Sequence, residues 1–387
     1  MKKYWENKRL LCHMLLYNND KGFCVGSLTP TAQEKPPGIS SGFDLLPWPE
    51  SFEDEEEIPL ADEGKDEEVS KKKLSKKEKR EMKQQRKVRA SHQKQLKRLQ
   101  ELQGESVRVR PNKANSYELV NSIRKVREKI INELKNSSSI TTSSDCKLFQ
   151  YQSVSFYRSD LEHLMPDEWL CDNVLSFVYE ILVETFVKPL PHSDQLFLLF
   201  PSLVQLFLHM PYDDSAVLEC LLPIKEMKSL RLVFVPVNYI DDVESTDLED
   251  NNNGDHWFLC VLNILEGKLL VYDSMVSDDD DDSLLEELGK RFCALPSLGI
   301  RLVSIQKMKC PQQTNFDDCG VYLLMFTCAI LSQLLGYEQN NKDGQSADQG
   351  DERFASLDLS GYSFEPLEGR LFIMQQVYEN FRCNLAN

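Results

Sequence analysis

The sequence predicts an α+β domain in the C-terminal half of the chain, preceded by a charged region that builds no core. Residues before about 145 are polar and patchy, whereas apolar runs dominate from Tyr151 onward. In that later part, short β-branched runs alternate with longer stretches of helical periodicity. Strands and helices mixed in this way pack around a single sheet.

The N-terminal region is dominated by two adjacent blocks of opposite charge. An acidic run at 50–68 precedes a basic segment at 70–102, and such blocks contain too few apolar residues to bury a core. The basic segment has no Gly or Pro before Gly104, so we expect a solvated helix there. We interpret its residues 71–98 as a nuclear-import signal, which predicts a nuclear and cytoplasmic protein; the alternatives are an anchoring patch or a plain charged helix.

A second helical pattern and a linker mark the expected domain boundary. Apolar residues recur at helical spacing over 117–134, and a Ser/Thr/Asn-rich stretch follows at 136–144. We therefore predict a low-complexity region at 1–145, mostly disordered with helical segments, and a folded domain at 146–387.

Within the folded domain, Glu266 and Gly267 form a turn between two apolar runs, so the flanking strands are expected to pair as a hairpin. A strand and a helix are expected around Pro201, in 196–210. The remaining pattern predicts helices at 166–187, 282–295, 320–335 and 371–385, and strands at 230–237, 257–264, 268–272 and 300–306.

Composition excludes several classes of function. The net charge of −17 argues against nucleic-acid binding by the whole chain, which needs clustered Lys and Arg. The 11 cysteines include no CxxC pair, so neither a zinc site nor a disulfide scaffold is predicted, and no metal is expected. No run of 18 apolar residues occurs and the first 16 residues make a poor signal peptide, so we expect a soluble intracellular protein without a membrane partner.

Three short segments carry the chemistry. His256 starts one strand of the expected hairpin and Asp273 follows the other, so the two side chains lie at the same end, where a carboxylate can orient an imidazole. Cys319 opens the long apolar helix, whose N-terminus favours a thiolate. Gln313 precedes it by six residues and offers an amide to a developing oxyanion. Each residue alone is more often structural, but together they make a nucleophile, a base, an orienting residue and an oxyanion donor.

These segments resemble the motif set of the Ulp/SENP cysteine peptidases, in the family order His, Asp, Gln, Cys. The resemblance extends from about Tyr151 to the C-terminus, and Trp169-Leu170-Cys171-Asp172 looks like the family's Trp-Leu-Asn-Asp segment, with Cys171 in place of Asn. It implies a papain-like cysteine protease domain, a central mixed sheet flanked by helices. It also implies a thiol isopeptidase that needs no cofactor and cuts after the C-terminal Gly-Gly of a ubiquitin-like modifier. The implied catalytic residues are Cys319, His256, Asp273 and Gln313, and the implied substrate-binding residues are Trp257, Trp169 and Asp172.

The branch of the family is read from segments outside the catalytic motifs. The chain lacks the Gly-Tyr and Arg-Arg-Trp stretch of SUMO proteases, and its Phe200-Pro201-Ser202 followed by a helix is similar to the deneddylase branch. We therefore expect a monomeric protease for the neddylation modifier and for its conjugates, such as cullins. The alternatives are a SUMO protease, an inactive modifier-binding module and a scaffold acting through the basic segment. The acidic runs 241–255 and 278–282 are read as solvated loops or as selectors of a modifier with a basic face.

Overall fold

The computed structural model describes residues 113–136, 145–190, 193–209, 230–240, 254–275, 282–295, 298–302, 304–340 and 357–385. The predicted disorder and import signal in residues 1–112, the acidic run 278–281 and most of the acidic run 241–255 lie outside the described residues. Among the helices that are described, none is long and apolar enough to cross a membrane.

A five-stranded mixed sheet forms the centre of the domain. Its order is β3 (Leu196–Leu198), β4 (Leu232–Tyr239), β5 (His256–Asn263), β6 (Lys268–Tyr272) and β7 (Ser304–Lys307). The two outer pairs are parallel and the two inner pairs are antiparallel. The predicted hairpin of β5 and β6 is confirmed, and Gly267 in its turn has a φ of 60°, which glycine adopts at low cost.

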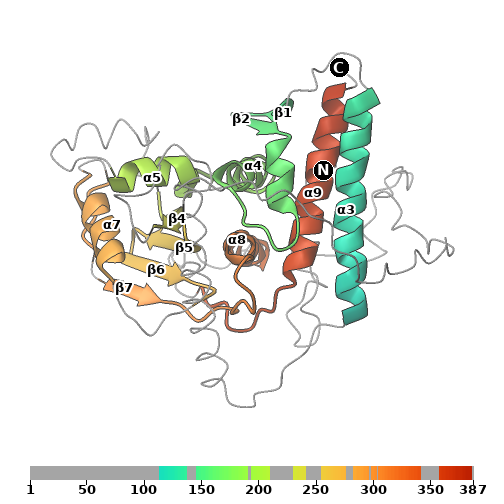
Figure 1. Ribbon diagram of the computed structural model, residues 1–387. Helices are drawn as coiled ribbons and strands as arrows, with labels where there is room; N and C mark the ends of the chain where they lie inside the picture. The colour runs from blue at the N-terminus through green and yellow to red at the C-terminus, as the bar shows by residue number, and fades with distance from the viewer. Residues whose placement is uncertain are drawn as a thin grey trace, which may run out of the picture. The chain divides into compact units, whose positions relative to one another are not determined.

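Side chains of β5 alternate between two apolar cores, as the pleat of a strand requires. Leu259 and Val261 face the core shared with α8 (Cys319–Asn340), whereas Phe258 and Cys260 face a second core. The second core is closed by α5 (Pro201–His209) and α7 (Ser283–Cys293). Figure 1 shows α8 end-on between the sheet and the C-terminal helix. Cys319, the first residue of α8, is buried. The predicted α+β class, with a mixed sheet flanked by helices, is therefore confirmed.

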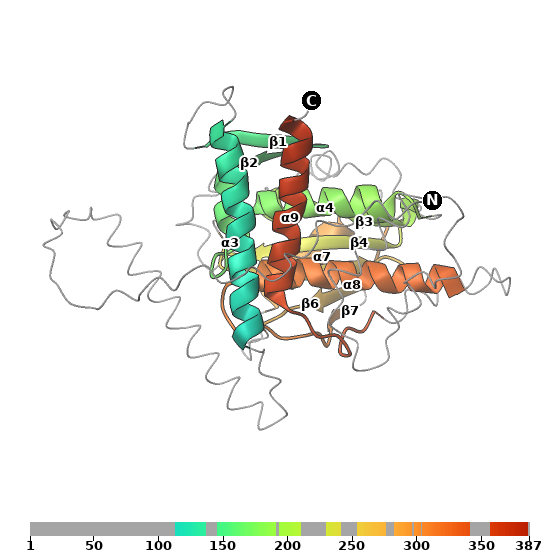
Figure 2. The ribbon, with the colours of Figure 1, turned by 90° about the vertical axis from the view of Figure 1, so that its right-hand side faces the viewer.

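The remaining described elements lie outside this sheet. They are α3 (Lys113–Asn136), the hairpin of β1 (Lys147–Tyr151) and β2 (Val154–Tyr157), the 3-10 helix η3 (Ser159–Leu164), α4 (Asp172–Leu182) with a π turn η4 (Val183–Val187), the short η5 (Ser193–Gln195) and α9 (Pro366–Leu385). Figure 2 shows α3 and α9 side by side, crossing α4 and α8.

Two predicted elements differ from the structure. The helix predicted over 166–187 begins only at Asp172, because residues 163–168 turn their carbonyl groups toward a buried arginine, described below, and so cannot continue a helix. The strand predicted over 300–306 is paired only from Ser304, opposite Lys268, where its partner β6 begins. The β1–β2 hairpin was not predicted, since its five- and four-residue strands are too short for a clear period.

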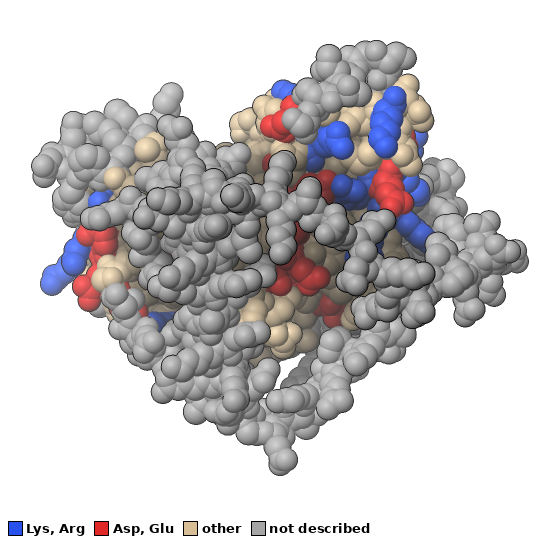
Figure 3. All heavy atoms as spheres, viewed as in Figure 1, with Lys and Arg blue, Asp and Glu red and all other residues tan. Residues whose placement is uncertain are grey.

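Helix α3 precedes the predicted domain boundary and packs on the domain. Its Leu119, Ile123 and Ile130 are buried in the same core as α9, and Tyr378 Oη donates to Glu133 Oε1 at 2.7 Å. The opposite face is charged: Figure 3 shows Lys and Arg side chains gathered over α3, where Arg124 and Lys129 are exposed. The 145/146 boundary stays a prediction, but the core includes this earlier helix.

Replacing Ile123 by Ala should lower the free energy of unfolding by about 2–5 kcal/mol, because its side chain is fully buried between α3 and α9. Lys129→Ala on the exposed face of the same helix should change it by less than about 0.5 kcal/mol. Urea unfolding of both variants measures the difference. Equal stability of the two variants would show that α3 is not part of the cooperative unit.

Candidate active site

The strand register brings His256 and Asp273 together, as the sequence predicted. His256 begins β5 and Asp273 follows the last residue of β6. His256 Nε2 and Asp273 Oδ1 are 2.7 Å apart, and the same oxygen accepts a hydrogen bond from the Met275 backbone N–H at 2.8 Å. The carboxylate is thus held at a fixed angle to the ring, and it selects the tautomer or cation that carries a proton on Nε2.

Cys319 lies beside the imidazole, at the first residue of α8. Its side chain is buried, and a helix N-terminus offers unpaired N–H groups to a negative charge. The other ring nitrogen of His256, Nδ1, is buried without a hydrogen-bond partner. The thiol therefore has an unoccupied proton acceptor near it and a helix dipole behind it.

The charge balance around the imidazole favours its cation. Burial by itself lowers the pKa of His256, but the Asp273 carboxylate and the neighbouring Cys319 together raise it to about 10. The His256 side chain is only 12% exposed, so solvent screens these interactions weakly. An imidazolium beside the thiol, together with the helix N-terminus, favours the thiolate, the form of a cysteine nucleophile that attacks carbonyl carbons.

Gln313 is held by hydrogen bonds to Ser274, just after β6, and to Asn315, two residues further along its own loop. Its backbone N–H donates to Ser274 O at 2.8 Å, and Ser274 Oγ donates to Gln313 Oε1 at 2.6 Å. Its side-chain nitrogen donates to Asn315 O at 2.8 Å, which engages one of two amide hydrogens. The second hydrogen is available for a negatively charged oxygen.

The three predicted substrate-binding residues meet near the start of α4. Trp257 is buried, and its indole N–H donates to Leu170 O at 3.0 Å. Trp169 is partly exposed and donates to Asp317 Oδ1 at 3.3 Å, two residues before the thiol. Asp172 begins α4 with Oδ1 buried and unpartnered, and burial raises the pKa of its carboxyl to about 6.

Cys171, which departs from the Trp-Leu-Asn-Asp pattern, is accommodated as a buried core residue. Its thiol donates to Asp160 Oδ1 at 3.6 Å, and the next residue but one, Asn173, donates to Asp160 Oδ2 at 2.6 Å. Burial raises the pKa of the Cys171 thiol to about 12, so this cysteine stays protonated and unreactive.

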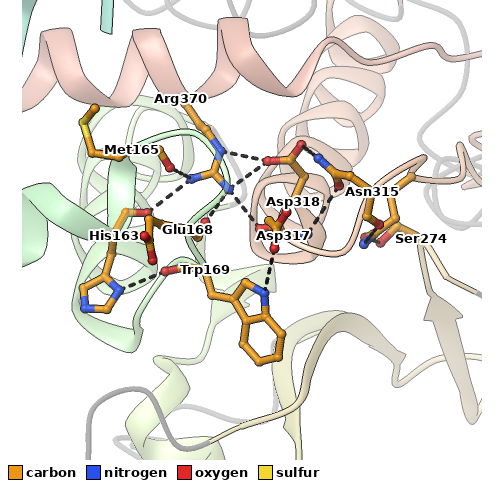
Figure 4. A network of polar contacts seen from close by, with 10 residues as sticks. His163, Met165, Glu168, Trp169, Ser274, Asn315, Asp317, Asp318 and Arg370 are labelled. Carbon is orange, nitrogen blue, oxygen red and sulfur yellow. Dashed lines mark hydrogen bonds and ion pairs between the residues drawn. The ribbon is translucent and has the colours of Figure 1, made fainter. Parts of the chain in front are cut away.

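Sequence reasoning missed Arg370 and Asn315. Figure 4 shows Arg370 reaching from α9 to Asp317 and Asp318, with Asn315 on the other side of Asp318. The available signal was an arginine next to the apolar pattern of the last helix, whose start was predicted at Leu371, five residues after its observed start at Pro366.

Where side chains are described, no group of three or more His, Cys, Asp or Glu residues is arranged to hold a metal ion.

The chain matches the family model of the Ulp1 protease family, C-terminal catalytic domain, over residues 223–349. That stretch contains His256, Asp273, Gln313 and Cys319, so the predicted similarity to the Ulp/SENP proteases is confirmed over the catalytic motifs.

Among known proteins, the chain is similar to NEDD8-specific protease 2 of Schizosaccharomyces pombe, with 30% identity over 191 residues, covering 48% of this chain and 42% of that protein. It is also similar to the probable sentrin-specific protease 8 of Dictyostelium discoideum, with 27% identity over 205 residues. The match covers 51% of this chain and 81% of that protein. Among solved structures, the chain matches the C-terminal Ulp1 protease domain in complex with Smt3, the yeast ortholog of SUMO. The TM-score is 0.43 and the identity 16%, and the match covers 66% of this chain and 95% of that one. The chain thus spans less than half the length of the S. pombe relatives that it matches.

Proposed function

We propose that this protein is a thiol protease that hydrolyses the bond after the C-terminal Gly-Gly of a ubiquitin-like modifier, in precursors and in conjugates to lysine. The observation that carries the proposal is the arrangement of His256, with Nε2 held by Asp273 at 2.7 Å, Nδ1 unpartnered, and the Cys319 thiol beside the ring at a helix N-terminus. The match to the Ulp1 protease family over the same residues supports it.

In the proposed reaction, the Cys319 thiolate attacks the carbonyl carbon of the terminal glycine and a C–S bond forms. The oxyanion is stabilised by the Gln313 amide and the Cys319 backbone N–H. The C–N bond then breaks as His256 gives its proton to the leaving amine, which leaves a thioester. Water, deprotonated by His256, attacks the thioester, releases the modifier as a carboxylate and restores the thiolate. No step requires a cofactor.

Trp257, Trp169 and Asp172 are the proposed contacts for the modifier's C-terminal tail. The buried Trp257 fixes the backbone at Leu170, and Trp169 presents a partly exposed ring next to the nucleophile's turn. The unpartnered Oδ1 of Asp172 suits a backbone N–H or a cationic side chain of the tail.

The neddylation modifier is the proposed substrate, with cullin conjugates among its targets. Three of the similar proteins are named NEDD8-specific protease, and others sentrin-specific protease 8. The basic segment 71–98 would direct a monomeric protease to the nucleus as well as the cytoplasm.

Labelling with modifier derivatives tests both nucleophile and specificity. The protein is incubated with the neddylation modifier, SUMO and ubiquitin, each with a thiol-reactive group in place of the terminal carboxylate, and adducts are mapped by mass spectrometry. We expect an adduct on Cys319 with the neddylation modifier at a rate about tenfold or more above the other two, a difference of about 1.4 kcal/mol. The Cys319→Ala variant is the control.

An adduct with SUMO instead would assign the protein to the alternative branch. Binding of a modifier without any adduct would identify an inactive modifier-binding module and overturn the proposed reaction.

A further inference from the structure

Arg370 is a fully buried charge that the proposed reaction does not use. It lies on α9, in the first turns after Pro366, and its side chain is 0% exposed. A buried guanidinium is stable only when its N–H groups are paired, and Arg370 makes such pairs with two separate segments (Figure 4).

The first segment is the loop that leads to Trp169. Arg370 Nη1 donates to His163 O at 3.2 Å and to Met165 O at 2.9 Å, and Nη2 donates to Glu168 O at 2.7 Å. His163 Nδ1 is in turn 3.0 Å from Trp169 O. This loop is therefore wrapped around one side of the guanidinium.

The second segment is the turn that ends at Cys319. Arg370 Nε donates to Asp318 Oδ1 at 2.8 Å, and Nη2 donates to Asp317 O at 2.9 Å. The Trp169 indole N–H also reaches this turn, at Asp317 Oδ1. One side chain thus fixes the distance between the Trp169 loop and the nucleophile.

The contacts continue from Asp318 to the proposed oxyanion donor. Asn315 Nδ2 donates to Asp318 Oδ2 at 2.5 Å, and Asn315 O accepts from the Gln313 side chain at 2.8 Å. Both carboxylate oxygens of Asp318 are occupied, so its charge is directed at Arg370 and Asn315 rather than at the sulfur of the next residue. Without that pairing, a carboxylate adjacent to Cys319 would oppose thiolate formation.

We infer that Arg370 is a positioning residue, which holds the Cys319 turn, Gln313 and the Trp169 loop in their reactive arrangement and keeps the Asp318 carboxylate away from the thiol. It acts through its neighbours and touches no reacting atom. The inference rests on the proposed function, since it concerns the same nucleophile.

Arg370→Lys is the main test, because lysine keeps the charge but cannot reproduce the forked set of donors. We expect kcat/KM on a fluorogenic derivative of the neddylation modifier to fall about 10- to 100-fold, the effect of a small displacement of a reacting group. We also expect the pH at which Cys319 becomes half-reactive toward iodoacetamide to rise. Arg370→Met should show larger changes in the same directions. If the arginine variants unfold, Asn315→Ala, which removes the contacts of this side chain with Asp318 Oδ2 and with the Asp317 backbone N–H, should show both changes at smaller size.

Arg291→Lys is the matched control. Arg291 is also buried, pairs with Glu287 and donates to Phe207 O at 2.7 Å, but it lies on α7 in the second core. We expect a loss of thermal stability similar to that of Arg370→Lys, with unchanged kcat/KM and unchanged Cys319 alkylation at temperatures where the protein is folded. A purely structural Arg370 would give the same result as this control.

Alkylation also separates failure of this inference from failure of the proposed function, because iodoacetamide needs no modifier. Exposed Cys383 serves as an internal reference in the same digest. If wild-type Cys319 reacts no faster than Cys383 at neutral pH, the proposed nucleophile is wrong. If wild-type Cys319 is fast and folded Arg370→Lys matches it in alkylation and within twofold in kcat/KM, only the positioning role is overturned.

Discussion

Replacing Cys319 by Ser should remove turnover and leave modifier binding intact. A serine hydroxyl beside His256 is nearly isosteric with the thiol, but its far higher pKa denies the site the stable thiolate that the helix N-terminus and the imidazolium favour. Loss of an essential nucleophile costs about 10⁴-fold or more in kcat, because the oxyanion donors and substrate binding alone provide only residual catalysis.

The measurement pairs single-turnover cleavage of a modifier fused to a fluorogenic amine with calorimetric titration of the same modifier. Binding within about threefold of wild type, with cleavage at background, is the expected pair of results. Cys328→Ser is the matched control, since Cys328 is buried about two and a half turns further along α8. It should keep its activity at temperatures where it is folded. Cleavage that persists in Cys319→Ser would exclude this residue as nucleophile and redirect attention to the other cysteines.

Asp273→Asn should reduce kcat/KM by about 10²- to 10⁴-fold, the usual range for disabling a general base. The side chain keeps its shape but loses the charge that opposes the effect of burial on His256. The pKa of the imidazole, now about 10, should therefore fall, because burial lowers it and Asp273 is the largest influence raising it. The imidazolium is then lost at lower pH, and with it the support for the thiolate.

The pH dependence of Cys319 alkylation tests this directly. In the wild type, the imidazolium that favours the thiolate should persist up to the His256 pKa of about 10. In Asp273→Asn, alkylation should require a higher pH. Glu286→Gln on α7, an exposed partner of Lys290, removes one negative charge away from the site and should leave both the rate and the pH profile unchanged. An unaltered profile in Asp273→Asn would mean that Asp273 does not set the protonation of His256.

Local sequence patterns predicted the residues that these two experiments change. Asp273 lies at the end of the hairpin, and Cys319 lies at the start of a helix. A two-stranded antiparallel ribbon with a short turn fixes which residues lie opposite one another, so His256 and Asp273 were placed together from the turn at Glu266 and Gly267 alone. The apolar run after Cys319 likewise identified the helix and its N-terminus. In both cases the prediction needed only one hairpin or one helix, whereas the meeting of Cys319 with His256 joins the two.

Other features depend on contacts between segments far apart in the chain, and no local pattern encodes them. Asp172 begins α4 six residues after the predicted start, because the preceding loop is shaped by Arg370, about 200 residues away. The buried face of α3 is apolar in the sequence, but only packing identified α9 as its partner. Neither Asn315 nor Ser274 was assigned a role from the sequence, and only the fold placed both against Gln313.

The sequence by itself determined the α+β class, the β5–β6 hairpin, the long helix behind Cys319 and the identity of the four proposed catalytic residues. Periodicity and short-range spacing decide these features. The tertiary structure alone decided how that set is held: the free Nδ1 of His256, the Ser274 and Asn315 contacts of Gln313, and the buried Arg370 that joins two loops to the last helix. A buried charge is stable only where distant backbone carbonyls and a carboxylate converge on it, and that convergence exists only in the folded chain.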